Sequence, residues 1–294
     1  MSNQHNGISC INGTFTPLHE AKIPISDRGF LFGHSIFETL LVKGDKIISW
    51  ESHFERMKLS CESSFIKIPD EKLLKDWCQH CAEINYKLSD PKPLKVQLRI
   101  IITGGNSFDL SIKRTNEILP NPNVIIICRN AVGPSQEQYM NGISLKCLPD
   151  LRAQGLIDIK SCSYLYNLMC LEIAKKEGYN DALFYNNLNL ITESTTANFI
   201  WFDEKSNVYS ASFKGSCLAG TTLSKLIQGM QKTNLHFAWK ELNLDNLAEA
   251  IGCGIISSIR GIVPVNKIDT THFDIHSQKK LFEKLNKVLE DQME

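Results

Sequence analysis

The chain has 294 residues, of which 43% are hydrophobic and 22% are charged, and its 32 basic and 32 acidic residues cancel to zero net charge. This composition is that of a globular protein large enough for two domains. The even charge balance gives no general attraction to nucleic acid or to an anionic membrane. The first residues lack the pattern of a secretory signal, and no apolar run approaches the ~20 residues of a membrane span. The sequence therefore predicts a cytoplasmic protein.

Ten cysteines are spread through the predicted helices and strands of this long chain. This distribution favours reduced, mostly buried thiols over disulfides. Cys78 and Cys81 lie three residues apart, with His80 between them, in a predicted helix over residues 71–84. Because no second Cys/His pair lies nearby in the sequence, helix packing is the favoured interpretation over a metal or redox site.

The amino-terminal part of the chain carries two hairpin signals. Residues 8–16 form two short strand-like runs around Asn12-Gly13, which is a strong two-residue turn signal. Residues 37–50 contain two more strand-like runs around a turn at 43–46. The elements expected after them are an amphipathic helix at 49–65, a helix at 70–85, and strands at 94–103 and 124–128.

A turn-rich stretch with two prolines, at residues 119–123, separates two parts of the chain. We expect a first α/β domain at 1–120, an interdomain connection at 121–135 and a second α+β domain at 136–294. The second domain mixes strands, hairpins and flanking helices, which predicts an α+β fold rather than a doubly wound sheet. Its expected strands are 143–148, 181–186, 188–192, 197–202 and 207–211, and its expected helices lie near 164–177, 222–232, 243–250 and 277–292.

Residues 25–39 mix two glycines and three phenylalanines with charged side chains. Asp27, Arg28 and Glu38 are costly to bury among aromatic residues unless they are paired. They therefore indicate a structured polar network near a site. A turn with scattered surface charges accounts for this segment equally well.

Four features of the sequence have the chemistry of an anionic cofactor site. Lys160 ends a short apolar run before a helix, and Glu193 follows a strand, so both are placed to face a cleft. Arg56 lies on a predicted helix, where it either binds an anion or is a solvated charge. Thr222 lies at the expected N-cap of a helix, beside N–H groups that can bind an anion, although plain capping explains it equally well.

A phosphorylated pyridine aldehyde needs these four groups: an amine to bind it, an acid to keep its ring nitrogen protonated, and two kinds of phosphate ligand. The chain resembles the class IV, or fold-type IV, pyridoxal-phosphate enzymes. These include branched-chain aminotransferases, D-amino-acid aminotransferases and aminodeoxychorismate lyases. The segments that carry the resemblance keep the family's order and spacing over nearly the whole chain: SDRGFLFGHSIFET (26–39), HFER (53–56), IKSCSYL (159–165), ITESTTANFIWF (191–202), LAGTT (218–222) and SSIRGIVPV (257–265).

The resemblance implies a role for each matching residue. Lys160 would bind the cofactor covalently and move protons to and from the substrate carbon, and Glu193 would pair with the pyridine nitrogen. Tyr164 matches a tyrosine that hydrogen-bonds the ring hydroxyl, with a core aromatic as the alternative. The phosphate ligands that the resemblance implies are Arg56, Thr221, Thr222 and Ser258.

The resemblance also implies a fold and an assembly. Two α+β domains, similar to those of D-amino-acid aminotransferases, would hold the cofactor between them. Family members are usually homodimers in which an early loop of one subunit lines the pocket of the other. That arrangement would place Arg28 and Phe30 near the neighbouring active site.

Thr39 is the residue that separates the subfamilies. Branched-chain aminotransferases typically have glycine at this position and D-amino-acid aminotransferases an apolar residue, whereas a threonine resembles aminodeoxychorismate lyases. Its hydroxyl would lie over the cofactor and assist the elimination of pyruvate. Residues 257–262 also resemble the lyases, although Ser257 replaces an asparagine.

One departure leaves the partner of the substrate carboxylate open. Many lyases and D-amino-acid aminotransferases have an arginine where this chain has Gly104. The residues that could replace it are Arg28, His53, Arg99 and Arg260.

The leading hypothesis is a lyase that converts 4-amino-4-deoxychorismate to 4-aminobenzoate and pyruvate in folate synthesis. The alternative is transamination, of D-amino acids or of branched-chain amino acids, with Lys160 making the proton transfer. A third hypothesis is a non-catalytic relative that keeps the scaffold for interaction; the intact set of Lys160, Tyr164, Glu193 and Arg56 argues against it.

Overall fold

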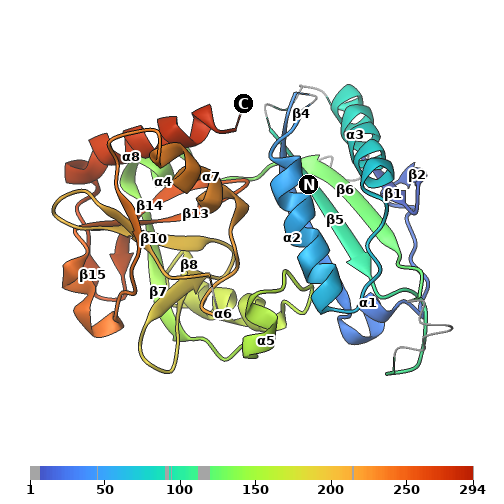
Figure 1. The fold of residues 1–294 in the computed structure, drawn as a ribbon, viewed down its shortest axis with the longest axis horizontal. Coiled ribbons are helices and arrows are strands. Elements are labelled where there is room, and N and C mark those ends of the chain that lie inside the picture. Colours follow the sequence, from blue (N-terminus) through green and yellow to red (C-terminus); the bar gives the residue numbers. More distant parts are fainter. Residues whose placement is uncertain are drawn as a thin grey trace. The chain divides into compact units, whose positions relative to one another are not determined.

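The computed structural model describes residues 7–44, 46–89, 93, 95–111, 120–213 and 215–293. The chain divides into two compact units: residues 1–132 with 159–163 form the first, and residues 133–158 with 164–294 form the second. Figure 1 labels many of the elements of each unit. Asp45, in the turn expected at 43–46, and Leu119, in the turn-rich stretch, lie outside the described residues.

The first unit is built on an antiparallel sheet with the strand order β2-β1-β6-β5-β3-β4. Asn12 and Gly13 join β1 to β2 with φ angles of 50° and 84°, the positive values that a two-residue hairpin turn requires, so this predicted hairpin is confirmed. The bounds of the strands are β1 Ile8–Ile11, β2 Thr14–Pro17, β3 Ser35–Lys43, β4 Lys46–Ile47, β5 Val96–Thr103 and β6 Val124–Asn130. Strand β6 falls inside the connection expected at 121–135, yet it pairs with β5 on one side and with β1 on the other.

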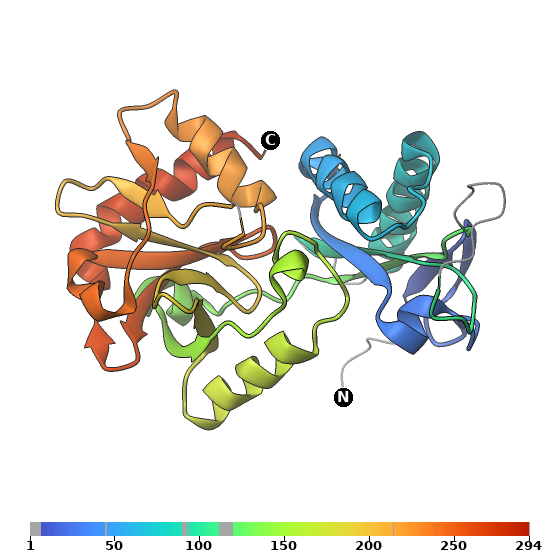
Figure 2. The ribbon, with the colours of Figure 1, turned by 60° about the horizontal axis from the view of Figure 1, so that its bottom comes forward.

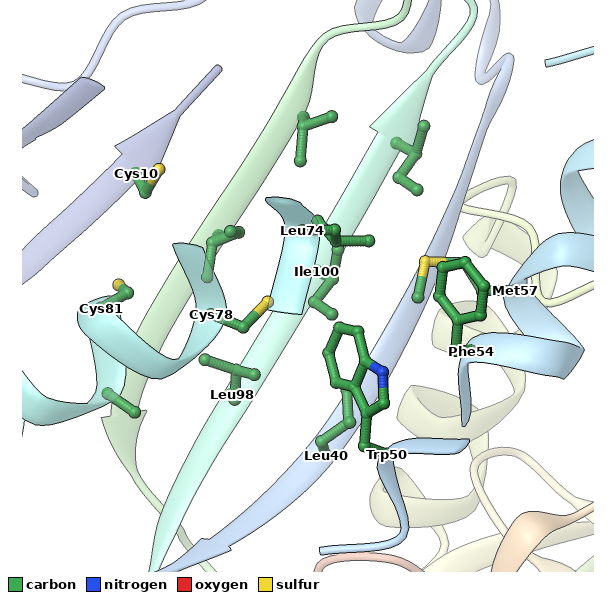
Figure 3. Packing of buried hydrophobic residues seen from close by; sticks show 14 of the residues in the cluster. Cys10, Leu40, Trp50, Phe54, Met57, Leu74, Cys78, Cys81, Leu98 and Ile100 are labelled. Carbon is green, nitrogen blue, oxygen red and sulfur yellow. The ribbon is translucent and has the colours of Figure 1, made fainter. Parts of the chain in front are cut away.

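Two long helices, α2 (Trp50–Ser63) and α3 (Glu71–Leu88), cover one face of this sheet, as Figure 2 shows in blue and teal; a short helix, α1, spans Arg28–Phe32. Side chains alternate between the two faces of a strand, so Leu98 and Ile100 of β5, two residues apart, both point toward the helices. Figure 3 shows these side chains meeting Met57 of α2 and Cys78 of α3. Cys78 and Cys81 are fully buried in this core, which confirms the helix-packing interpretation.

A segment distant in sequence, Ile159–Ser163, extends this sheet at the start of β3. The N–H of Phe37 donates to the carbonyl of Lys160 at 2.9 Å, and the N–H of Cys162 donates to the carbonyl of Ser35 at 2.9 Å. Ser161 forms an antiparallel bridge with Ile36. Backbone pairing to β3 therefore fixes the main chain of Lys160.

The second unit contains a nine-stranded sheet whose strands are β7 Ile143–Pro149, β8 Asp181–Tyr185, β9 Ile191–Ser194, β10 Asn198–Phe202, β11 Val208–Ser210, β12 Phe237–Trp239, β13 Gly252–Ser257, β14 Gly261–Ile268 and β15 Thr271–His272. Strand β10 pairs with both β13 and β9, so the six strands β10-β13-β14-β7-β8-β9 form a closed ring. One apolar cluster, which includes Phe199, Trp201 and Val263, joins residues of these strands. The unit thus mixes parallel and antiparallel strands with helices, which confirms the predicted α+β class.

The helices of this unit are α4 Gln136–Asn141, α5 Gln154–Ile157, α6 Leu165–Lys176, α7 Thr221–Met230, the 3-10 helix η1 Leu244–Glu249 and α8 Ile275–Asp291. Helices α7 and α8 pack against each other and against β10 and β13 through a second apolar cluster. Helix α6 packs against β8 through Cys170 and Ala174. Among the helices that the structure describes, none combines the length and the apolar character needed to cross a membrane.

Candidate active site

Lys160 is half-buried, and its Nζ lies 4.6 Å from the ring centroid of Phe37. Phe37 itself is 5% exposed and belongs to β3, the strand that holds the main chain of Lys160. The contact of an ammonium with an aromatic face is favourable and orients the amine. Lys160 is therefore not a fully exposed surface lysine, and its role as the cofactor lysine stays a prediction.

A second cation shares the same ring. The guanidinium carbon of Arg99 lies 4.1 Å from the centroid of Phe37. Arg99 on β5 pairs in register with Thr39 on β3, and Thr39 lies two residues from Phe37 and so on the same face. Burial raises the pKa of the nearby Cys162 thiol, and its hydrogen bond with Ser35 and the charges of Arg99 and Lys160 oppose that rise. This face of β3 and β5 thus brings together the amine of Lys160, the guanidinium of Arg99 and the hydroxyl of Thr39.

The opposite face of β3 carries a buried ion cluster. Glu38 is fully buried and accepts hydrogen bonds from Nε and Nη2 of Arg56, each at 2.7 Å; its Oε2 lies 2.7 Å from Nδ1 of His53. Burial alone would raise the pKa of Glu38, but the charges and hydrogen bonds of Arg56 and His53 hold it well below its usual value. Burial lowers the pKa of His53, against the attraction of Glu38. Arg56 is thus positioned by an ion pair and is not a solvated surface charge.

Arg28 is also buried, but by a different set of partners. Its Nε donates to Nδ1 of His34 at 3.1 Å, and its Nη atoms donate to the backbone carbonyls of Asp109 and Leu110. Nε2 of His34 lies 2.7 Å from the carbonyl of Ser64. Arg28 therefore joins helix α1 to the loop at 109–110.

The imidazole of His34 explains why position 104 is a glycine. A Cβ built on Gly104 would collide with Nδ1 of His34. His34 therefore fills the space that a side chain at this position would need. Nearby, Asp27 caps α1 through its side chain and accepts from Thr103 and Asn123, so the polar network expected around residues 25–39 is confirmed.

In the second unit, Glu193 is held by a partner that the sequence analysis missed. Nη1 of Arg152 donates to Oε1 of Glu193 at 2.9 Å, and the N–H of Leu218 donates to Oε2 at 3.2 Å. Asp150 in turn pairs with Nε and Nη2 of Arg152. Burial would lower the pKa of Arg152, but Asp150 and Glu193 raise it above its usual value. The signal in the sequence was an acid and a base, Asp150-Leu151-Arg152, immediately after a strand.

Helix α7 begins beside three hydroxyl groups. Oγ of Ser258 lies 3.1 Å from Oγ1 of Thr222 and 3.4 Å from Oγ1 of Thr221. The N-cap is Gly220, and no side chain makes a capping hydrogen bond there. The capping interpretation of Thr222 is therefore wrong, because the helix begins one residue before it. A Cβ on Gly220 would collide with Oδ1 of Asn198, so only glycine fits there.

Tyr164 is at the N-cap of α6 and is half-buried. Its hydroxyl donates to the carbonyl of Thr195 at 2.5 Å, and Nδ2 of Asn167 donates to the same carbonyl at 2.9 Å. Nη2 of Arg260 donates a hydrogen bond to the hydroxyl of Thr196, and Nη1 of Arg260 lies 3.6 Å from Oδ2 of Asp181. Phe30, by contrast, is 65% exposed on α1.

These groups fit pyridoxal phosphate by their chemistry. Lys160 supplies a sheltered amine, and Glu193 is a buried acid held beside a guanidinium. The first turn of α7 has backbone N–H groups without intrahelical partners, which together with the hydroxyls of Thr222 and Ser258 suit a phosphate. In the first unit, Arg56 provides a guanidinium that is fixed by Glu38, and a guanidinium is also a group that suits a phosphate.

Comparison with known proteins agrees with this chemistry. The family model described as "Amino-transferase class IV" matches residues 35–268. D-alanine aminotransferase of Bacillus licheniformis is 26% identical over 259 residues, which cover 88% of this chain and 87% of that protein. A hypothetical aminotransferase from Mycobacterium tuberculosis, solved in a PLP-bound form, superposes with a TM-score of 0.84 at 17% identity, over 98% of this chain and 99% of that one. A putative 4-amino-4-deoxychorismate lyase from Legionella pneumophila superposes with a TM-score of 0.78 at 23% identity, over 94% and 97% of the two chains.

Proposed function

The chain belongs to the class IV aminotransferases and is therefore a pyridoxal-phosphate-dependent enzyme, and we propose that it acts as an aminodeoxychorismate lyase. In this reaction 4-amino-4-deoxychorismate is converted to 4-aminobenzoate and pyruvate, which would place the enzyme in folate biosynthesis. The solved structures that share its fold include a putative lyase of this kind. The observation that carries the proposal is the position of Thr39.

Thr39 lies on the face of β3 that also carries Phe37, the residue in contact with Lys160. A hydroxyl on this face can donate a proton or a hydrogen bond close to the amine. An apolar residue or a glycine at this position could not do so. We propose that Thr39 assists the departure of pyruvate in this way.

Lys160 is the proposed site of cofactor attachment and the base that takes the substrate proton. When bound, pyridoxal phosphate supplies an electron sink that stabilises negative charge on the substrate carbon. Glu193 would hold the proton on the ring nitrogen, and Arg152 fixes the carboxylate of Glu193 through a hydrogen-bonded ion pair. Tyr164, whose hydroxyl donates to the carbonyl of Thr195, would use the same oxygen to accept a hydrogen bond from the ring hydroxyl.

The proposed phosphate ligands are Arg56, Thr221, Thr222 and Ser258. Glu38 fixes Arg56, so the guanidinium meets the phosphate with little loss of side-chain entropy. The hydroxyls of Thr222 and Ser258, 3.1 Å apart, add to the N–H groups of α7.

For the substrate carboxylate we propose Arg99, because it shares the ring of Phe37 with Lys160. In 4-amino-4-deoxychorismate the enolpyruvyl group, which carries a carboxylate, is attached to the ring carbon next to the one that carries the amine, so a cation beside Lys160 would be placed to receive that carboxylate. Arg260 is proposed as a second anion ligand. Arg28 and Phe30, both in helix α1, are proposed to lie near the active site of a neighbouring subunit, with the exposed Phe30 lining its pocket and the buried Arg28 fixing the loop at 109–110.

The test is a pair of assays on the purified protein reconstituted with pyridoxal phosphate. With aminodeoxychorismate we expect equal amounts of aminobenzoate and pyruvate. With D-alanine and 2-oxoglutarate we expect at most slow amino transfer. Absence of both products from the first assay would remove the lyase proposal. A Thr39→Val variant, which keeps the side-chain shape, should lose most lyase turnover and retain the bound cofactor.

Transamination of D-amino acids is the second candidate. The observation that favours it is the match to D-alanine aminotransferases over 88% of the chain. In that case Lys160 would move a proton between two carbons, and Thr39 would be dispensable. The same pair of assays therefore distinguishes the two activities, with branched-chain amino acids as a third donor class.

We also propose that the enzyme is a homodimer in the cytoplasm. Helix α6 exposes four large apolar side chains at helical spacing, namely Leu165, Leu168, Met169 and Ile173. A stripe of this kind on a water-exposed helix suits a protein interface. All ten cysteines are free thiols, as is usual in a reducing compartment.

A further inference from the structure

The carboxylate of Asp181 is a buried charge that none of the proposed cofactor ligands uses. Asp181 begins β8 and is 2% exposed. Its Oδ1 accepts from the N–H of Ala182 at 2.8 Å and from the hydroxyl of Thr195 at 2.5 Å. Its Oδ2 lies 3.6 Å from Nη1 of Arg260. A carboxylate is costly to bury unless it is hydrogen-bonded or paired with a cation. The partners of Asp181 meet this need, and the carboxylate in turn holds them in a fixed arrangement.

One of these partners, Thr195, belongs to the turn at 195–197, which joins β9 to β10. The N–H of Thr195 donates to the carbonyl of Ala182 at 3.2 Å. The carbonyl of Thr195 accepts from Tyr164 and from Asn167 of α6. Thr195 is therefore fixed by β8 through its side chain and amide, and it holds the Tyr164 hydroxyl through its carbonyl. The turn begins two residues after Glu193.

The other partner is Arg260, in the turn between β13 and β14. Its Nη2 donates to the hydroxyl of Thr196, and its backbone carbonyl accepts from the hydroxyl of Tyr139 at 2.6 Å. The side chain keeps a partly exposed surface, at 24%. The buried acid Asp181 and the exposed Thr196 thus orient the guanidinium of Arg260 from two sides, and the guanidinium still reaches solvent.

We propose that Asp181 is a positioning residue of the active site, which fixes the Thr195–Thr196 turn and aims the guanidinium of Arg260 at a substrate carboxylate. It touches neither cofactor nor substrate and acts through Thr195 on Tyr164 and through its charge on Arg260. This inference rests on the proposed function. An asparagine in its place would keep the shape and the hydrogen bond to Thr195 but would lose the charge that holds Arg260.

The experiment compares Asp181→Asn with wild type in the unloaded and the reconstituted protein. In the unloaded protein, hydrogen exchange of peptides covering residues 191–202 should become faster, because Arg260, which donates to Thr196, loses its ion pair with residue 181. In the reconstituted protein, the visible absorption band of the bound cofactor changes with pH. The midpoint of that change should fall by roughly half a pH unit, since removal of the negative charge at residue 181 disfavours the protonated form of the cofactor. KM for the substrate whose carboxylate Arg260 would bind, 4-amino-4-deoxychorismate, should rise roughly tenfold with a smaller change in kcat.

Asp203→Asn is the matched control, because Asp203 also accepts hydrogen bonds from its own turn, from Asn207 and Tyr209. It should leave the cofactor band and KM unchanged. If Asp181→Asn fails to fold, Thr195→Val removes only the hydroxyl donor and should still speed exchange at the turn. The inference is overturned if Asp181→Asn, or Thr195→Val in its place, lowers the melting temperature but leaves exchange at the turn, the band and KM as in wild type. A wild-type protein that forms no visible band would instead overturn the proposed function.

Discussion

Arg152 donates a hydrogen bond from Nη1 to Oε1 of Glu193 across 2.9 Å, and both side chains are largely buried. Arg152→Gln removes the positive charge and leaves the acid without its ionic partner. A charge-assisted hydrogen bond of this kind contributes about 1.5–3 kcal/mol. If Glu193 holds the ring proton, we expect the affinity for pyridoxal phosphate to fall by roughly tenfold or more, measured by titration of the visible band.

Lys146→Gln is the control for this variant. Lys146 forms ion pairs with Glu177 and Asp269 in the same unit, but on the surface. Surface pairs contribute about 0–1 kcal/mol, so cofactor affinity should stay within about twofold. Equal affinities in Arg152→Gln and wild type would show that Glu193 does not depend on its partner.

The cluster of Glu38, His53 and Arg56 predicts that the protein is sensitive to acid. The pKa of Glu38 is lowered in the folded state, so its stabilising effect is present above the unfolded pKa of about 4.3 and is lost as pH falls. The pKa of His53 is also lowered, so the unfolded state binds a proton that the folded state does not below about pH 6.5. Both effects have the same sign. The free energy of unfolding should therefore decrease as pH falls from 7, first through His53 and then, below about pH 4.3, also through Glu38, measured by denaturant titration.

Removal of the acid from this cluster should be costly at neutral pH. Glu38→Gln leaves Arg56 buried without its ion pair, for which we expect a loss of about 3–5 kcal/mol. The acid-dependent part of the stability curve that belongs to Glu38 should disappear in the same variant. If Glu38→Gln is as stable as wild type at pH 7, the ion pair of Glu38 with Arg56 does not stabilise the fold.

Much of the fold was predictable because it depends on local patterns. The Asn12-Gly13 turn predicted the first hairpin, and the apolar run at 94–103 predicted strand β5, whose Leu98 and Ile100 lie in the core. Helix α4 was missed although Ser135 and Gln138 form a capping box, because the turn residues Gly133 and Pro134 dominate that stretch.

What escaped the sequence analysis depends on pairing between distant residues. The ring of strands closes where Glu193 pairs with Asn198, and β13 and β14 pair across the turn that carries Arg260. Apolar runs around that turn do not by themselves specify which strands they join. The motifs identified Glu193 through its family pattern, but only the folded chain brings Arg152 to it, 41 residues away in sequence.

The contact of His34 with Gly104 predicts a narrow tolerance at position 104. Gly104→Ala places a methyl group against the imidazole and should destabilise the protein by about 1–3 kcal/mol, measured as a lower Tm. Gly155→Ala is the control, because a Cβ there meets nothing within 4 Å. The double variant His34→Ala with Gly104→Ala should recover part of the loss that overpacking causes. If Gly104→Ala unfolds at the wild-type temperature, His34 does not exclude a side chain at 104.

The apolar stripe of α6 predicts the dimer interface. Leu168 and Met169 are each 53% exposed, so Leu168→Lys with Met169→Glu should leave the fold intact. If the stripe is the interface, these charges should raise the dimer dissociation constant by roughly tenfold or more, measured by sedimentation equilibrium. Leu59→Lys, at a leucine 62% exposed on α2, is the matched control and should not change the mass in solution. An unchanged mass in both variants would place any interface elsewhere.

Arg99 is the residue on which substrate recognition should depend most. Its guanidinium stacks on Phe37 opposite Thr39, so Arg99→Gln removes a cation without emptying the face of the sheet. Loss of an ionic hydrogen bond to a carboxylate should raise KM by roughly 10–100-fold, while the visible cofactor band stays. Arg129→Gln is the matched control, since Arg129 lies on the neighbouring strand β6 but is exposed. A rise in KM for Arg129→Gln equal to that for Arg99→Gln would point to general charge attraction. No rise for Arg99→Gln would transfer the role to Arg260, whose guanidinium is held by Asp181.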